Sequence, residues 1–139
     1  MIEFSYQTDF ELTSEKDHSK WLVDIADGHD SVIESVGYVF CDDEFVHSIN
    51  LKHLNHDTYT DIITFDYGTD DVLDGEIYIS VDRVRENAVE LNQLFEVELR
   101  RVMAHGLLHM MGFGDHDENE KIKMREMEDN ALSMFHVKQ

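Results

Sequence analysis

Hydrophobic and polar positions follow two different rhythms along this chain, and the first is typical of strands. β-Branched and aromatic residues dominate four short runs, as is usual in strands. A Gly-Thr-Asp-Asp turn separates the last two. The runs cover about residues 2–8, Ser35–Cys41, Thr60–Tyr67 and Gly75–Ser80. These segments predict a small β-sheet.

The second rhythm is the three-to-four-residue spacing of apolar side chains in amphipathic helices. An apolar stripe closed by Gly28 predicts a first helix, and Ser80 is a natural N-cap for a third. Asp117 and Glu120 resemble a capping box for the last one. The expected helices run from about Ser14 to Gly28, after Asp42 or Asp43 with Phe45, Ile49 and Leu51, from Ser80 to Asn92, from Phe95 to Met111, and from Asp117 to Phe135.

Strands come first and helices dominate the second half, so the sequence predicts an α+β fold. We expect one domain over residues 1–139, with a mixed sheet of about four strands packed against about five helices. The helix at Phe95–Met111 is apolar on much of its circumference, so it is expected to be central. Its predicted buried face comprises Leu99, Val102, Met103, Leu107 and Met110.

This central helix also carries the most specific chemical signal of the chain. His105 and His109 are four residues apart, so they lie on one helical face. Gly112 can end the helix in a left-handed turn, and the reversed chain can bring His116 to the pair. Three imidazoles leave coordination positions open, as a catalytic metal site requires. The pattern predicts one divalent transition metal; we favour Zn²⁺, and Ni²⁺ or Cu²⁺ also suit these ligands.

The residue after the first histidine argues against one class of metalloenzyme. Zinc peptidases carry a Glu there as general base, whereas this chain has Gly106. The six other histidines show no spacing typical of metal ligands. They are expected to be ordinary surface or half-buried side chains: His18, His29, His47, His53, His56 and His136.

Composition limits the partners of this protein. The formal net charge is −20, from 31 acidic and 11 basic residues. Such a surface argues against a protein that coats nucleic acid, because phosphate contacts need Lys and Arg. It does not exclude a local basic cleft or a metal that contacts one phosphate. The densest basic residues form either a phosphate track or a solvated face: Arg83, Arg85, Arg100 and Arg101.

The chain shows no sign of a membrane segment or a secretory signal. No apolar run has the length of a membrane span, and the N-terminus lacks the pattern of a signal peptide. Cys41 is the only cysteine, which excludes an internal disulfide and suits a reducing cytosol. We therefore expect a cytoplasmic protein without a membrane partner.

The segment from His105 to His116 reads His-Gly-x-Leu-His-x-x-Gly-Phe-x-Asp-His, which resembles the motif of the YbeY family. These are bacterial metal-dependent endoribonucleases. Supporting resemblances lie at Asn50, Asp57–Phe65, Gly75–Ile79 and Met124–Leu132, so nearly the whole chain is covered. The resemblance implies action on single-stranded RNA in rRNA maturation and ribosome quality control. Its implied partners are ribosomal small-subunit proteins or assembly factors; DNA is not expected.

The chain departs from the family pattern at three places. Six residues separate His109 from His116 where five are usual, and Gly114 is the apparent extra one. Leu54 stands where the family commonly has an Arg that matters for activity, and Tyr59 where it has Pro. Glu76 replaces the family's Asp, which is a mild change.

The resemblance implies phosphodiester cleavage either by a metal-activated water or by the metal as Lewis acid on a phosphate oxygen. Asp115 is expected either to orient a ligand imidazole or to be a solvated residue before the last helix. Two alternatives stay open. Without the family Arg, the chain could be a ribosome-assembly factor with a mainly structural metal. Its acidic surface would also suit a metal hydrolase of small molecules.

Overall fold

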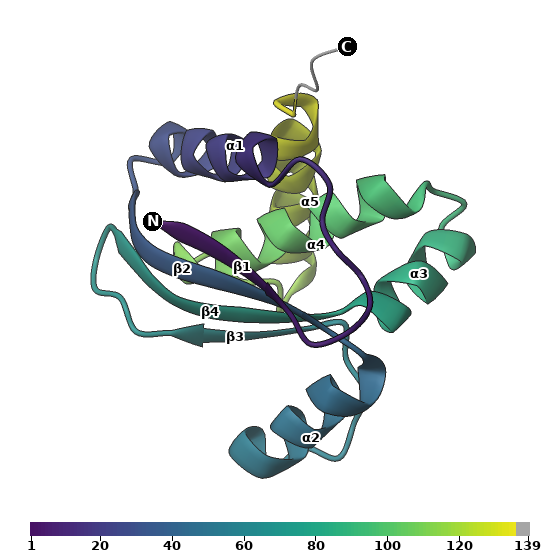
Figure 1. Cartoon of the computed structure of the whole chain (residues 1–139). Coiled ribbons are helices and arrows are strands. Elements are labelled where there is room, and N and C mark those ends of the chain that lie inside the picture. The colour runs from purple at the N-terminus through teal and green to yellow at the C-terminus, as the bar shows by residue number, and fades with distance from the viewer. Residues whose placement is uncertain (136–139) are drawn as a thin grey trace.

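One mixed sheet organises the structure, a computed structural model that describes residues 1–135 (Figure 1). Its strand order is β1-β2-β4-β3, with β1, β2 and β4 parallel and β3 antiparallel at the edge. The predicted strands are therefore confirmed, with shifted ends. They are β1 at Ile2–Tyr6, β2 at Val32–Cys41, β3 at Ile62–Asp66 and β4 at Val72–Ser80.

Helices cover the two faces of this sheet unequally. Figure 1 shows α1, α4 and α5 over one face, α2 alone on the other, and α3 beyond the end of β4. The described residues thus form the single α+β domain that the sequence predicts. The helices are α1 at Glu15–Gly28, α2 at Asp43–Leu54, α3 at Val81–Glu90, α4 at Phe95–Met110 and α5 at Glu118–Ser133.

Alternation along β2 divides the apolar interior into two clusters. Tyr38 and Phe40 belong to the main core beneath α1 and α4, whereas Val39 and Cys41 belong to a smaller core with α2. This is the period-two pattern of a sheet buried on both faces. All five residues of the predicted buried face of α4 are buried: Leu99, Val102, Met103, Leu107 and Met110.

Two buried hydrogen bonds fix the positions of α4 and α5, the helices that carry the candidate functional side chains. The Tyr38 hydroxyl donates to the Met103 carbonyl at 2.8 Å and ties α4 to the centre of the sheet. The Trp21 indole N–H donates to the Ala131 carbonyl at 2.7 Å and ties α5 to α1. A buried donor that lost such a partner would cost the free energy of its desolvation, so these contacts restrict helix position.

The predicted helix after Asp42 is present as α2, and of the three apolar residues named for it Ile49 is buried. Phe45 and Leu51 are exposed, and Val46, Ile49 and Asn50 are the buried residues of this helix. Asn50 is held by its side-chain N–H, which donates to the Thr58 carbonyl at 2.9 Å. The small core therefore receives Val46 and Ile49 from α2, whereas the neighbouring Phe45 points to a different side of the helix.

His18 is also not the surface or half-buried histidine that we expected. It is 3% exposed, its Nδ1 lies 2.9 Å from the Ser14 carbonyl oxygen, and its ring packs on Phe135. Burial lowers the pKa of this imidazole. Four others are exposed or half-buried as expected, and His136 lies outside the described residues. The four are His29, His47, His53 and His56.

Over the described part of the chain, no helix combines the length and the apolar character that crossing a bilayer requires.

Candidate metal centre

Two imidazoles lie together on the last two turns of α4. The rings of His105 and His109 are 4.4 Å apart between centroids and nearly perpendicular. Their positions follow from the helix repeat, which brings residues i and i+4 onto one face. Both side chains are partly exposed at the edge of the main core, so a ligand can reach them.

Each ring is anchored through the same nitrogen. His105 Nδ1 lies 2.6 Å from Glu128 Oε2, and His109 Nδ1 lies 2.8 Å from the carbonyl oxygen of Phe113. A carbonyl and a carboxylate accept hydrogen bonds, so Nδ1 carries the proton in both rings. In the neutral ring Nε2 then bears the lone pair that binds metals. The two anchors thus pre-orient two metal ligands.

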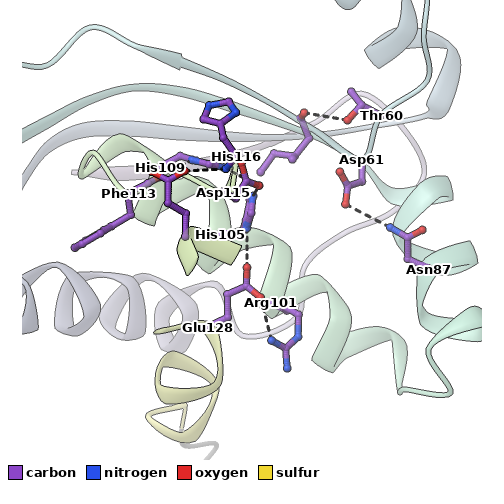
Figure 2. Close-up of polar contacts among 12 residues, drawn as sticks. Thr60, Asp61, Asn87, Arg101, His105, His109, Phe113, Asp115, His116 and Glu128 are labelled. Atoms are coloured by element: carbon purple, nitrogen blue, oxygen red, sulfur yellow. Dashed lines mark hydrogen bonds and ion pairs between the residues drawn. The ribbon is translucent and has the colours of Figure 1, made fainter. Parts of the chain in front are cut away.

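Asp115 completes a group of three side chains at this point. Its Oδ2 lies 3.4 Å from His105 Nε2 and 3.6 Å from His109 Nε2 (Figure 2). The ligand atoms of these three residues all lie within 4.8 Å of one another, which is close enough for a shared metal ion. Asp115 faces the Nε2 atoms of both rings. A residue that orients an imidazole would instead contact Nδ1, but the two Nδ1 atoms already have Glu128 and the Phe113 carbonyl as partners. This position would allow Asp115 itself to be a ligand.

The structure does not bring His116 into this group. Gly112 has φ +100° and turns the chain after α4, as the sequence predicts. His116 follows that turn, is exposed, and donates its backbone N–H to Glu120 Oε1 at 3.0 Å. Figure 2 shows its ring pointing away from His105 and Glu128. Its assignment as a metal ligand stays a prediction.

Glu128 contacts the candidate site and was not singled out by the sequence analysis. It lies on α5, is 6% exposed, and is held from its other side by Arg101, whose Nη1 donates to Oε1 at 3.0 Å. Burial alone would lower the pKa of His105, but the hydrogen bond and charge of Glu128, with the charge of Asp115, outweigh it and raise that pKa. A carboxylate behind a ligand imidazole is the usual support of metal-bound histidines.

A cleft of about 330 Å³ opens beside His105. Its acidic lining residues include Glu98 and Asp61, and burial raises the pKa of both carboxyl groups. Arg101 is the least exposed of its Arg and Lys residues, and Glu128 and Asp129 both bind its guanidinium. The whole lining comprises Asp61, Leu91, Glu98, Arg101, Val102, His105, Asp115, Lys121, Met124, Arg125 and Glu128.

The four arginines singled out from the sequence do not form one track. Arg83 binds Asp43 and Glu86, and Arg85 approaches Asp82, all at the far end of the sheet on α2 and α3. Arg100 lies over the Phe135 ring, with 4.2 Å between its guanidinium carbon and the ring centroid. Of the four, Arg101 alone lines the cleft beside His105: Arg83, Arg85 and Arg100 have other surroundings.

The position of the expected family arginine lies in a different hollow. Leu54 is the last residue of α2 and is exposed. Together with Asn50 and His56 it lines a depression that borders β3, and none of the three lines the cleft beside His105. Positive charge next to the candidate metal centre therefore comes from α4 and α5 in this structure.

Comparison with known proteins gives consistent matches over the whole length. A family model described as Endoribonuclease YbeY matches residues 3–136. A protein of Flavobacterium johnsoniae named Endoribonuclease YbeY is 45% identical over 139 residues, with both chains fully covered. A protein of the same name from Karelsulcia muelleri is 41% identical, and the match covers 95% of this chain and 94% of that one.

A solved structure shares the fold. It is the solution structure of TM1509 from Thermotoga maritima, with a TM-score of 0.70 and 27% sequence identity. The match covers 97% of this chain and 89% of that chain. The arrangement of sheet and helices described above is thus found in a protein that shares about a quarter of the residues.

Proposed function

Because the chain belongs to the YbeY family of endoribonucleases, we propose that it cleaves single-stranded RNA with the help of one divalent metal ion. The observation that supports a metal is the pair of anchored imidazoles on α4, whose Nε2 atoms face one carboxylate oxygen. When bound, such an ion supplies Lewis acidity and lowers the pKa of a water from about 16 toward roughly 7.

We propose His105 and His109 as two ligands and the Asp115-His116 pair as the source of the third. The carboxylate is the nearer group in this structure, whereas His116 is the one that the sequence motif favours. With Asp115 the donors are two nitrogens and one oxygen, and with His116 they are three nitrogens; both sets suit Zn²⁺, and Ni²⁺ also accepts them. Three protein ligands leave a position open for water or a phosphate oxygen.

The residues around the centre have distinct tasks in this proposal. Glu128 holds His105 in the orientation that presents Nε2, and Arg101 holds Glu128. The Phe113 carbonyl does the same for His109. Arg101, Lys121 and Arg125 line the cleft and supply the positive charge that an approaching phosphodiester needs, in place of the arginine missing at Leu54.

We further propose rRNA as the substrate and the cytoplasm as the place of action, with ribosomal small-subunit proteins or assembly factors as partners. The net charge of −20 supports a need for partners. Phosphates bind poorly to such a surface outside a local basic site, so a protein partner that already holds the RNA would deliver it.

The proposal is tested by single-turnover cleavage of an unstructured RNA oligonucleotide by zinc-reconstituted protein. His109→Ala is expected to abolish cleavage, because it removes a proposed ligand. His56→Ala is the matched control, because this exposed histidine does not line the cleft, and it is expected to leave cleavage unchanged. Equal inertness of wild type and His109→Ala, with ribosome assembly retained by both, would overturn the nuclease proposal in favour of an assembly factor.

The third ligand is decided by a separate pair of variants. Asp115→Asn and His116→Ala are each titrated with Zn²⁺ against a chromophoric chelator. The variant that lacks the true ligand is expected to lose most of the affinity, and the other to keep it. If neither variant binds more weakly than wild type, the Asp115-His116 pair supplies no ligand.

A further inference from the structure

A buried carboxyl group lies in the cleft beside the candidate metal centre. Glu98 is on α4, two turns before His105, and is 5% exposed. Its Oε1 is buried and accepts no hydrogen bond within the part of the chain that the structure describes. Buried polar atoms are nearly always paired, so each exception calls for an explanation. Glu98 lines the cleft, which makes a ligand the simplest one.

The surroundings of Glu98 limit what that ligand can be. Arg101 and Arg125 share the cleft, so a second metal ion would meet repulsion there. Among residues 1–135, the three-residue group that fits a metal is the one at His105. A free phosphate would meet the carboxylates of Asp61 and Glu98 in the same space. The occupant must therefore be largely neutral at this point and must donate a hydrogen bond.

A nucleobase has these properties. It is uncharged, it offers N–H donors on its Watson–Crick edge, and proteins that read single-stranded RNA stack such bases on arginine planes. The cleft supplies the guanidinium of Arg125 and an apolar edge from Leu91 and Met124. Its volume of about 330 Å³ lies at the small end of ligand pockets, which suits one base with its sugar.

We propose that this cleft holds one unpaired base of the RNA substrate, next to the phosphodiester at the metal centre, and that Glu98 accepts a hydrogen bond from it. The inference rests on the proposed function and names a binding residue for it. Guanine suits a carboxylate best, because its N1–H and N2–H donors lie side by side. Uracil suits it least, since its single N3–H lies between two carbonyl oxygens.

The experiment measures binding of nucleoside 5′-monophosphates to the full chain by calorimetry, with and without Zn²⁺. Guanosine monophosphate is expected to bind about 10-fold or more tightly than uridine monophosphate, because a hydrogen bond to a charged group is strong. Inosine monophosphate lacks the 2-amino group and is expected to fall between them. This comparison needs only the wild-type protein.

Two variants assign the effect to one side chain. Glu98→Gln is expected to lose the preference for guanosine monophosphate, whereas Glu96→Gln, on the exposed face of the same helix, keeps it. Equal binding of guanosine and uridine monophosphates by wild type, or an unchanged preference in Glu98→Gln, would overturn the inference.

The two proposals can fail independently. Mononucleotides have no phosphodiester bond to cleave, so their binding does not depend on nuclease activity. Cleavage without a base preference would remove the role of Glu98 and keep the nuclease. A guanosine preference in a protein that cleaves no RNA would keep the base site and remove the proposed reaction.

Discussion

Loss of the Glu128 carboxylate is expected to weaken Zn²⁺ binding by about 10- to 100-fold. The bond from His105 Nδ1 to Glu128 Oε2 is 2.6 Å long and Glu128 is almost fully buried, so water cannot replace the acceptor without rearrangement. Glu128→Ala leaves the imidazole free to rotate and makes Nε2 a weaker donor to the metal. The expected loss corresponds to about 1.4 to 2.7 kcal/mol.

Replacement by glutamine separates orientation from charge. Glu128→Gln keeps a carbonyl oxygen that can accept from His105 Nδ1 but removes the negative charge, so its loss is expected near the lower limit, about 10-fold. Its amide NH2 group then faces Arg101, which keeps Asp129 as an acceptor at 2.7 Å in both variants, whereas alanine leaves the Nδ1–H of His105 without its acceptor. Alanine is therefore expected to be the more damaging change for both metal binding and folding.

Competition against a chromophoric zinc chelator at pH 7.5 measures these affinities directly. Glu126→Gln is the matched control, since Glu126 is exposed on the same helix, and it is expected to bind like wild type. Thermal melts of the metal-free proteins verify that each variant is folded. An affinity of Glu128→Ala within twofold of wild type would refute the idea that this carboxylate supports the metal ligand.

Three further outcomes concern stability. Leu107→Ala is expected to cost about 2–5 kcal/mol in urea unfolding, because this fully buried side chain leaves a cavity in the main core. Gly75→Ala is expected to destabilise the sheet strongly in the same assay, because its Cβ would lie 2.0 Å from the Phe65 carbonyl oxygen, whereas Gly28→Ala meets nothing within 4 Å and is tolerated. Burial lowers the pKa of His18, so its contribution to stability is complete above pH 6.5 and is lost as pH falls below that value; His18→Asn is expected to flatten this part of a pH series of melts.

The elements of this fold could be predicted because their signals are local. Ser80 accepts from the backbone N–H of Arg83, and Asp117 with Glu120 forms the complete capping box, as the sequence indicates. Both caps need only residues within one turn. The apolar stripe of α4 could be predicted as well, because its spacing repeats over four turns. Leu107, which belongs to this stripe, is fully buried.

The errors arise where neighbouring residues compete for the same core. Phe45 and Val46 are adjacent and both apolar. In the structure Val46 is buried in the small core between α2 and the sheet, and Phe45 is exposed. His18 is a polar residue in a helix rich in charged residues, so the sequence alone suggests a surface position. Its burial depends on Phe135, which is more than a hundred residues away in the chain.

The candidate site was predictable only where its residues belong to a recognisable sequence motif. His105 and His109 are found by spacing, but Glu128 and Glu98 belong to 31 acidic residues that look alike in the sequence. The sequence contains one weak signal for a buried Glu128. Glu128 lies between Met124 and Ala131 at helical spacing, so a carboxylate occupies the apolar stripe of α5. Recognising its partner still required the packing of α5 against α4.

Gly106 shows how packing and chemistry are joined at this site. A Cβ there would lie 2.8 Å from Ile62 Cδ1 and 3.1 Å from Ile77 Cγ2, so α4 packs directly on β3 and β4 at this residue. A larger residue such as the peptidase glutamate would separate the helix from the sheet. The general base of a peptidase is thus incompatible with the contact that positions His105.

Because the chain is acidic, a bound metal ion would have a second role, which is to reverse the net charge of the cleft. Four carboxylates line the cleft, at Asp61, Glu98, Asp115 and Glu128, against three cations, at Arg101, Lys121 and Arg125. With every acid ionised, the lining carries one net negative charge, and a divalent ion would make it one net positive charge. A phosphodiester would then meet its strongest attraction beside the bound ion, with Arg101, Lys121 and Arg125 nearby. Because such coupling is reciprocal, RNA would in turn strengthen the binding of the metal. In the proposed reaction, the substrate would be held through the metal centre rather than through the general surface of the chain.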